Sequence, residues 1–197
     1  MPLFKPHLYA LDAYQPPLEG RSAHRHLLLD FNERTLPVSP AITAALRDYI
    51  QSGPLQKYPA YGDITARLAA YAGVEPAQLM ITNGSDQGID LVIRAATGPS
   101  DRAIIPAPSF AIYAQCAQVQ NAELIAPPYQ INAGYPLDAV LAAIDERTRL
   151  IVIPLPNNPS GTAPPLAAIE RIAQAAPAAL VLVDECYFEY TGLTAAP

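Results

Sequence analysis

Short apolar runs alternate with helical patterns from residue 78 onward, and this alternation constrains the fold more than any other feature. The expected strands are residues 78–82, 102–106, 122–126, 150–154 and 179–183. The expected helices are residues 86–97, 109–120, 137–146 and 165–175. Strands and helices that alternate at this spacing predict βαβ units and a mostly parallel sheet. The fourth and fifth strands are apolar on both faces, which is typical of strands covered by helices on both sides.

Two more helices are expected upstream of this region. Ser39 precedes Pro40 and a run of apolar residues with helical spacing, a combination typical of a helix start. Another helix is expected over residues 63–72, with Gly73 just beyond its end. The beginning of the chain has no strong periodicity. We therefore expect an N-terminal arm over residues 1–35 and one large domain over residues 36–197.

Composition and charge exclude several classes of protein. The chain has 197 residues, of which 51% are hydrophobic and 15% charged, as in a globular domain with a core. A net charge of −6 argues against a nucleic-acid or anionic-membrane partner. The beginning of the chain lacks the apolar segment of a signal peptide, and no apolar run is long enough to span a bilayer. Cys116 and Cys186 have no metal-ligand spacing, so we expect a cytoplasmic protein without a metal.

Three polar clusters each follow directly after an expected strand. They are residues 82–86, 156–161 and 184–187. Ligands of open parallel sheets bind outside the carboxyl ends of the strands, so the three clusters are expected to face one crevice. The first cluster is a glycine turn that leads into a helix. Free N–H groups at such a helix start suit a phosphate.

Each polar or aromatic candidate also fits a purely structural role. Ser85 or Asp86 fits a helix cap, and residues 156–161 have the composition of a tight turn. Asp184 fits a cap at a strand end or a buried carboxylate with a cationic partner. Phe110 fits either the core or a platform on which a ring stacks.

Taken together and in this order, the motifs resemble those of fold-type I enzymes that depend on pyridoxal 5'-phosphate (PLP). Within these enzymes the chain is most similar to the histidinol-phosphate aminotransferases, which are class I/II aminotransferases. The resemblance implies an α/β fold: the three-layer αβα, mostly parallel sheet of the PLP-dependent transferase large domain, incomplete in this chain. The matching segments are residues 30–33, 57–59, 83–91, 108–113, 156–161 and 184–187.

The resemblance implies how the cofactor phosphate and ring are held. The backbone amides of Ser85 and Asp86 would bind the phosphate at a helix N-terminus. Phe110 would stack on the pyridine ring. Asp184 would pair with the ring nitrogen and keep it protonated, which makes the ring a better electron sink.

Five further roles follow from the same resemblance. Asn158 and Tyr187 would hydrogen-bond the 3-oxygen of the cofactor. Tyr58 would reach the phosphate of a neighbouring subunit, which implies a homodimer. Tyr14 and Asn32 would lie near the substrate. The family often has Asn-Glu-Asn-Pro where this chain has Asn-Glu-Arg-Thr from Asn32 onward, so the substrate end is less well defined than the cofactor end.

The resemblance also implies groups that this chain lacks. A PLP transaminase needs a lysine as Schiff base and proton shuttle. The two lysines, Lys5 and Lys57, both precede the phosphate loop, and neither fits this role, so no catalytic residue is assigned. Two later strands, which in the family lie between the first strand and the rest of the sheet, are missing too. We therefore expect an N-terminal fragment of a longer enzyme that is inactive by itself.

Three functions remain open at this point. The first is transamination of histidinol phosphate with 2-oxoglutarate, giving imidazole-acetol phosphate and glutamate in histidine biosynthesis. The second is a related PLP enzyme, such as a threonine-phosphate decarboxylase or an aromatic aminotransferase. The third is a non-catalytic PLP-binding fragment, because the Schiff-base lysine is missing.

Overall fold

The computed structural model describes residues 3–12, 18–22, 24–53 and 55–196. The chain forms two compact units, one made of residues 1–14 and 65–197 and the other of residues 15–64. The expected boundary between an arm and a large domain at residue 35 stays a prediction. Within the described residues, no helix has both the length and the apolar character needed to cross a membrane.

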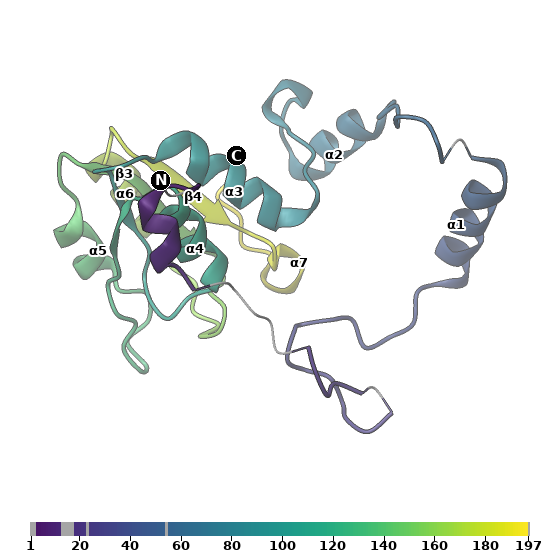
Figure 1. Cartoon of the computed structure of the whole chain (residues 1–197), viewed down its shortest axis with the longest axis horizontal. Coiled ribbons are helices and arrows are strands. Elements are labelled where there is room, and N and C mark those ends of the chain that lie inside the picture. Colours follow the sequence, from purple (N-terminus) through teal and green to yellow (C-terminus); the bar gives the residue numbers. More distant parts are fainter. Residues whose placement is uncertain (1–2, 13–17, 23, 54, 197) are drawn as a thin grey trace. The chain divides into compact units, whose positions relative to one another are not determined.

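The larger unit, in which Figure 1 labels β3 and β4, is built around a parallel sheet of four strands. The strand order is β2-β1-β3-β4. The expected strands of this region form with bounds shifted by a few residues. Every neighbour in the sheet is parallel because a helical segment separates consecutive strands. The strands are β1 (Arg102–Ile104), β2 (Glu123–Ile125), β3 (Thr148–Pro154) and β4 (Leu180–Asp184).

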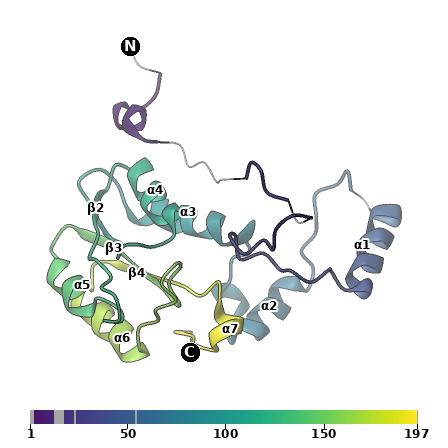
Figure 2. The same ribbon diagram turned by 90° about the horizontal axis from the view of Figure 1, so that it is seen from below.

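Helices cover both faces of this sheet, as Figure 2 shows. One face carries α3 (Gly84–Ala96) and α4 (Ala111–Val119), and the other carries α5 (Leu137–Ala143) and α6 (Leu166–Ala175). The expectation of a three-layer αβα fold is confirmed. The sheet is smaller than the one expected for a complete large domain of this kind.

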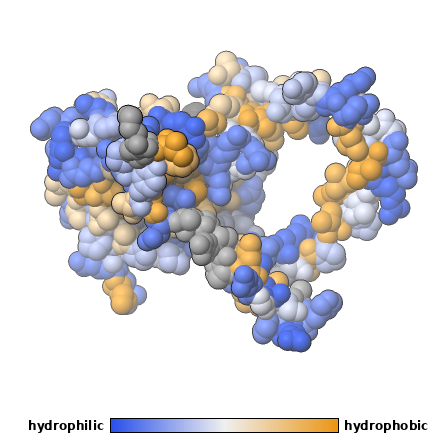
Figure 3. All heavy atoms as spheres, in the orientation of Figure 1, coloured by the Kyte–Doolittle hydropathy of each residue, from blue (hydrophilic) through white to orange (hydrophobic). Residues whose placement is uncertain are grey.

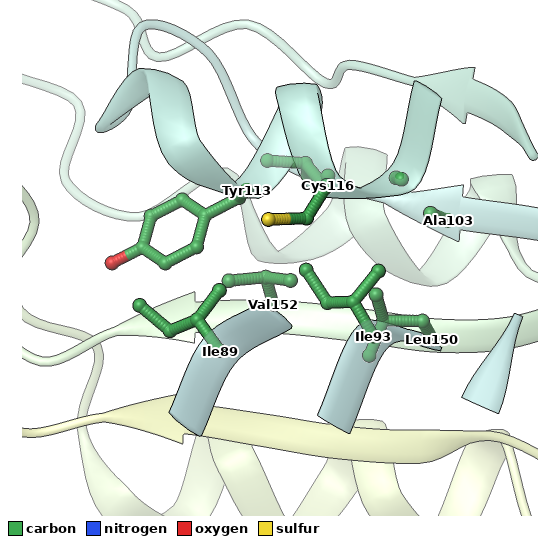
Figure 4. Packing of buried hydrophobic residues seen from close by; sticks show 9 residues of the cluster. Ile89, Ile93, Ala103, Tyr113, Cys116, Leu150 and Val152 are labelled. Atoms are coloured by element: carbon green, nitrogen blue, oxygen red, sulfur yellow. The ribbon is translucent and has the colours of Figure 1, made fainter. Parts of the chain in front are cut away.

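Each layer is held by its own apolar core. On the first face, Ile89 and Ile93 of α3 pack with Tyr113 of α4 against Leu150 and Val152 of β3 (Figure 4). On the second face, β3 presents its other side to α5 and α6; the buried residues there include Ile151, Ile153, Val140, Ile169 and Ile172. Strand β3 is therefore buried from both sides, which explains its nearly continuous apolar sequence.

One expected strand does not form. Residues 78–82 were predicted as a strand, but the 3₁₀ helix η2 (Pro76–Gln78) occupies the start of this segment. Leu79 has extended backbone angles, φ −112° and ψ 133°, yet no described strand pairs with this segment. A strand needs hydrogen bonds from a neighbour. According to the family resemblance, two later strands would lie between this segment and the rest of the sheet, and they are not in this sequence.

The two helices predicted upstream of the sheet both form. Helix α1 (Pro40–Ser52) starts at the Ser39 cap, whose hydroxyl accepts a hydrogen bond from the Ile42 amide at 3.4 Å. Helix α2 (Ile64–Ala72) stops before Gly73, which has a positive φ of 71°. Hydrophobic side chains along α1 are exposed, as the space-filling view in Figure 3 shows. The remaining short elements are the 3₁₀ helix η1 (Pro6–Ala10) and helix α7 (Phe188–Thr191).

Candidate functional site

The chain reverses its direction of travel across the sheet at β1. From β1 it passes to β2 on one side, and then returns to β3 on the other side of β1. Connecting segments on opposite faces of the sheet leave a crevice at such a switch point, outside the carboxyl ends of the strands. The loops after β1, β3 and β4 all lie at this edge, and they contain Phe110, Asn158 and Tyr187.

Asp184 is the last residue of β4 and is only 8% exposed. Its Oδ2 accepts a hydrogen bond from the Tyr113 hydroxyl at 2.6 Å, and its Oδ1 accepts one from the Cys186 amide at 3.0 Å. Each carboxylate oxygen has two lone pairs, so the group retains capacity for a further donor on either oxygen. This fits a carboxylate that is oriented in advance to receive a partner.

Tyr113 and Cys186 stay protonated beside this carboxylate. Burial, followed by the charge of Asp184, raises the pKa of the Tyr113 hydroxyl well above its ordinary value. The same two causes raise the pKa of the Cys186 thiol to about 12, although the residue as a whole is exposed. Neither the Tyr113 hydroxyl nor the Cys186 thiol is therefore expected to carry charge near neutral pH.

Phe110 immediately precedes α4, and its ring stands edge-on to that of Tyr113. The ring centroids are 6.0 Å apart with an interplanar angle of 89°. Phe110 is partly buried and packs against the core cluster of α3, α4 and β3. One side of Phe110 thus packs in the core while another part of the residue stays accessible. Its position is compatible with both expected roles, core packing and stacking on a ring.

Asn158 and Tyr187 come from the loops after β3 and β4 and meet at the sheet edge. The Asn158 side-chain amide donates to the Tyr187 hydroxyl at 3.4 Å. Tyr187 also makes an edge-on ring contact with Tyr190, at 6.4 Å between centroids. Two polar groups from separate loops are thereby brought to one place, as the strand order predicts.

The turn into α3 leaves the start of this helix without a side-chain cap. Gly84 has a positive φ of 77°, a backbone conformation that glycine adopts without strain. Asn83 is the cap residue, but its side chain makes no cap hydrogen bond in the described chain. Ser85 and Asp86 lie inside the first turn, so neither is the cap residue. Their backbone amides belong to the first four N–H groups of the helix, which have no partner within it.

The start of α3 lies near the turn after β4. The charge of Asp86 contributes to the raised pKa of Cys186, two residues beyond Asp184. The turn into α3 and the buried Asp184 carboxylate therefore belong to the same region of the larger unit.

Three of the expected site residues do not belong to the described part of the larger unit. Tyr14 lies outside the described residues. Asn32 and Tyr58 belong to the smaller unit, where Asn32 has a positive φ of 54° and Tyr58 is fully exposed. The turn around Asn32 is tied locally, because Arg21 pairs with Asp30 at 2.8 Å and Glu33 at 2.5 Å.

Two further residues at the site, Tyr113 and Asn157, belong to the sequence motifs of residues 108–113 and 156–161 without an individual predicted role. Tyr113 lies three positions after Phe110, a spacing that places both on one side of a helical turn. Asn157 directly precedes Asn158 and is only 2% exposed, with its side chain hydrogen-bonded to the loop after β1. Helical spacing was an available signal for Tyr113. No local signal in the sequence indicates the partner of Asn157.

Comparison with known proteins gives a consistent result. Residues 26–194 match the profile of the family described as aminotransferase class I and II. An aromatic amino acid aminotransferase of Nocardia farcinica is 38% identical over 194 residues, covering 96% of this chain and 53% of that protein. A histidinol-phosphate aminotransferase of Xylella fastidiosa is 39% identical over 171 residues, covering 84% of this chain and 45% of that protein.

A solved structure shares the fold. The crystal structure of histidinol-phosphate aminotransferase from Sinorhizobium meliloti, in complex with pyridoxal-5'-phosphate, superposes with a TM-score of 0.81 at 23% identity. The match covers 96% of this chain and 52% of that one. The chain thus spans about half the length of the curated relatives it matches.

Proposed function

This chain belongs to the class I and II aminotransferase family, and on that premise we propose that the protein is a PLP-dependent transaminase whose cofactor lies at the carboxyl edge of the sheet. Family membership indicates PLP as the cofactor. The observation that carries the proposal is the buried Asp184 carboxylate at the end of β4, held by Tyr113 and a backbone amide. PLP supplies an electron sink for the electrons of the substrate Cα–H bond.

The residues of the crevice fit this cofactor chemically. Asp184 retains an acceptor site and would hold a proton on the pyridine nitrogen. The uncapped start of α3 presents the amides of Ser85 and Asp86, which would bind the phosphate without a lysine or arginine. Phe110 would cover one face of the ring, at a partly exposed position beside the core.

The 3-oxygen of the cofactor would be bound by the pair Asn158 and Tyr187. Their hydrogen bond of 3.4 Å is long, so the Asn158 side-chain amide has capacity for a stronger bond to the cofactor. A hydroxyl and an amide aimed at one oxygen would stabilise its anionic form. These residues would therefore tune the charge of the cofactor as well as hold it.

Three further residues concern the substrate and the second subunit. We propose that Tyr14 and Asn32 face the substrate and that Tyr58 reaches the phosphate bound by the other subunit of a cytoplasmic homodimer. The full exposure of Tyr58 in the smaller unit is compatible with a contact to a second chain. The Schiff-base lysine would lie beyond residue 197, because Lys5 and Lys57 are exposed and precede the phosphate turn.

We propose histidinol phosphate as the amino donor and 2-oxoglutarate as the acceptor, giving imidazole-acetol phosphate and glutamate. The named relative from Xylella fastidiosa supports this choice. Transamination of an aromatic amino acid is the second candidate, because the Nocardia farcinica relative of that name matches nearly the whole chain. The two reactions share the cofactor chemistry and differ in whether the donor carries a phosphate.

The proposal is tested on the protein at its natural length. After incubation with PLP we expect a visible absorption band that borohydride reduction removes, and glutamate release when histidinol phosphate and 2-oxoglutarate are added. Turnover with phenylalanine or tyrosine, but not with histidinol phosphate, would instead identify an aromatic amino acid as the amino donor. A protein that forms no such band would contradict the assignment of these residues to PLP.

A further inference from the structure

We propose that Asn157 is a positioning residue that sets the spacing between two groups of the cofactor site, Phe110 and Asn158. The inference rests on the proposed function. It concerns the loops after β1 and β3, which flank the switch point of the sheet. Its basis is one buried amide that joins these two loops.

The Asn157 side chain is bonded in three directions. Its Oδ1 lies 2.7 Å from the Ser109 hydroxyl, which shares its single hydrogen between this oxygen and the Pro106 carbonyl at 2.6 Å. Its Nδ2 donates to the Pro108 carbonyl at 3.0 Å and to the Ser160 hydroxyl at 2.8 Å. Both N–H donors of the amide are therefore in use, and only 2% of the residue is exposed.

The backbone of the same residue closes its own loop. The Asn157 amide donates to the Thr162 carbonyl at 2.8 Å, and its carbonyl accepts from the Gly161 amide at 2.7 Å. Backbone hydrogen bonds of Asn157 thus hold the loop after β3 together. The Asn157 side chain joins this loop to the loop after β1. A buried amide whose donors and acceptor all have partners favours one arrangement of its neighbours.

Each of the two loops carries a proposed cofactor contact one residue away from this network. Phe110 follows Ser109, and Asn158 follows Asn157. Phe110 would contact the ring face and Asn158 the 3-oxygen, so the amide of Asn157 fixes how far apart these two contacts lie. Binding groups need supporting side chains of this kind, because small displacements weaken what they hold.

A role confined to folding would have a different signature. If Asn157 only stabilised the turn, its loss would lower the melting temperature and leave the folded protein with an unchanged cofactor site. A positioning role changes the affinity for PLP and the ionisation of the bound cofactor. An amide donor beside the 3-oxygen stabilises its anionic form, so a displaced Asn158 moves the pH midpoint of the visible band upward.

The experiment uses the natural-length protein and two independent changes to the network. Asn157→Asp keeps the size of the side chain but removes both N–H donors. Ser109→Ala removes one of the two bonds between the Asn157 side chain and the other loop, and Ser109→Thr restores a hydroxyl. Thr148→Val is the matched control, since Thr148 is equally buried but hydrogen-bonded to Asp145 at the opposite end of β3.

Dissociation constants for PLP and the pH midpoint of the visible band are measured for each variant, with Asn158→Ala as reference. We expect Asn157→Asp and Ser109→Ala to weaken PLP binding roughly tenfold, as for a lost buried hydrogen bond. Both should move the midpoint in the direction of Asn158→Ala, whereas Ser109→Thr and Thr148→Val should keep the wild-type values.

Two results would overturn the proposal, and they are distinguishable. If both network variants lower the melting temperature but keep the wild-type affinity and midpoint, Asn157 is structural only and the proposed function stands. If the wild-type protein itself forms no visible band with PLP, the proposed function fails and this inference fails with it.

Discussion

The Tyr113 hydroxyl donates a hydrogen bond of 2.6 Å to Oδ2 of Asp184, and both residues are buried. They are 71 positions apart in the sequence, so the bond joins α4 to the end of β4. The other carboxylate oxygen accepts from the Cys186 amide. Donors from two separate segments thus hold the carboxylate in one orientation.

Replacing Tyr113 by phenylalanine should lower the free energy of unfolding by about 1.5–3 kcal/mol, the usual range for a hydrogen bond to a charged group. The physical reason is that a buried carboxylate oxygen loses its donor while the ring packing is kept. Urea unfolding followed by circular dichroism measures the change. Tyr135→Phe is the control, because the Tyr135 hydroxyl is buried without a partner in the described chain, and its loss should be neutral or stabilising. Equal destabilisation by both changes would contradict this assignment.

The stability should fall in alkaline solution, and Tyr113 should contribute to the fall. Burial and then the Asp184 charge raise the pKa of Tyr113 in the folded state. Above about pH 10 the tyrosine of the unfolded chain ionises while the folded one keeps its proton, so unfolding is favoured as pH rises. Urea unfolding is measured from about pH 9 to about pH 11, on either side of the ordinary tyrosine pKa. The free energy of unfolding should depend less on pH in Tyr113→Phe than in the wild type. Identical slopes would sink the prediction.

Phe110 should contribute to PLP affinity through its ring. Phe110→Leu keeps an apolar side chain but removes the aromatic face, and we expect binding to weaken about three- to tenfold, the worth of one aromatic contact. Phe110→Tyr should bind nearly as well as the wild type, since the ring remains. Fluorescence or absorbance titration of the natural-length apoprotein measures both. A leucine variant that binds PLP as the wild type does would remove the proposed stacking role.

The two thiols should react slowly with alkylating reagents. Burial raises the pKa of Cys116 to about 11 and, together with Asp184, that of Cys186 to about 12. Because the thiolate is the reactive form, alkylation by iodoacetamide near pH 8 should be roughly tenfold or more slower than for a free peptide thiol. Mass spectrometry of timed samples follows both sites. Rapid labelling of Cys186 would show that its exposed surface, rather than the nearby carboxylate, governs its reactivity.

The chain of residues 1–197 should show no transaminase turnover when mixed with PLP, histidinol phosphate and 2-oxoglutarate. Its two lysines, Lys5 and Lys57, both precede the phosphate turn, so no amine is expected where the reaction needs a Schiff base. Coupled detection of glutamate provides the measurement, with a complete class I and II aminotransferase as positive control. Turnover above the rate of PLP alone would refute the prediction.

The sequence predictions agree with the structure where the pattern that supports them comes from residues close together in the chain. Strand β3 forms where its apolar run predicted a covered strand, and α1 starts at the Ser39 cap, because neighbouring residues largely define these patterns. Residues 78–82 are partly apolar, as in a strand, but form none. A strand needs a partner segment with which its backbone can form hydrogen bonds. Propensity alone does not provide that partner.

The sequence by itself determined which segments become helices and strands from residue 102 to residue 184, and that polar residues follow the strands. Periodicity and turn residues act over a few positions, so they can be read without the fold. Only the tertiary structure decided that Tyr113 meets Asp184 and that Asn157 meets Ser109. These pairs are distant in sequence and become neighbours through the strand order, because the switch between β1 and β3 brings their loops to one edge.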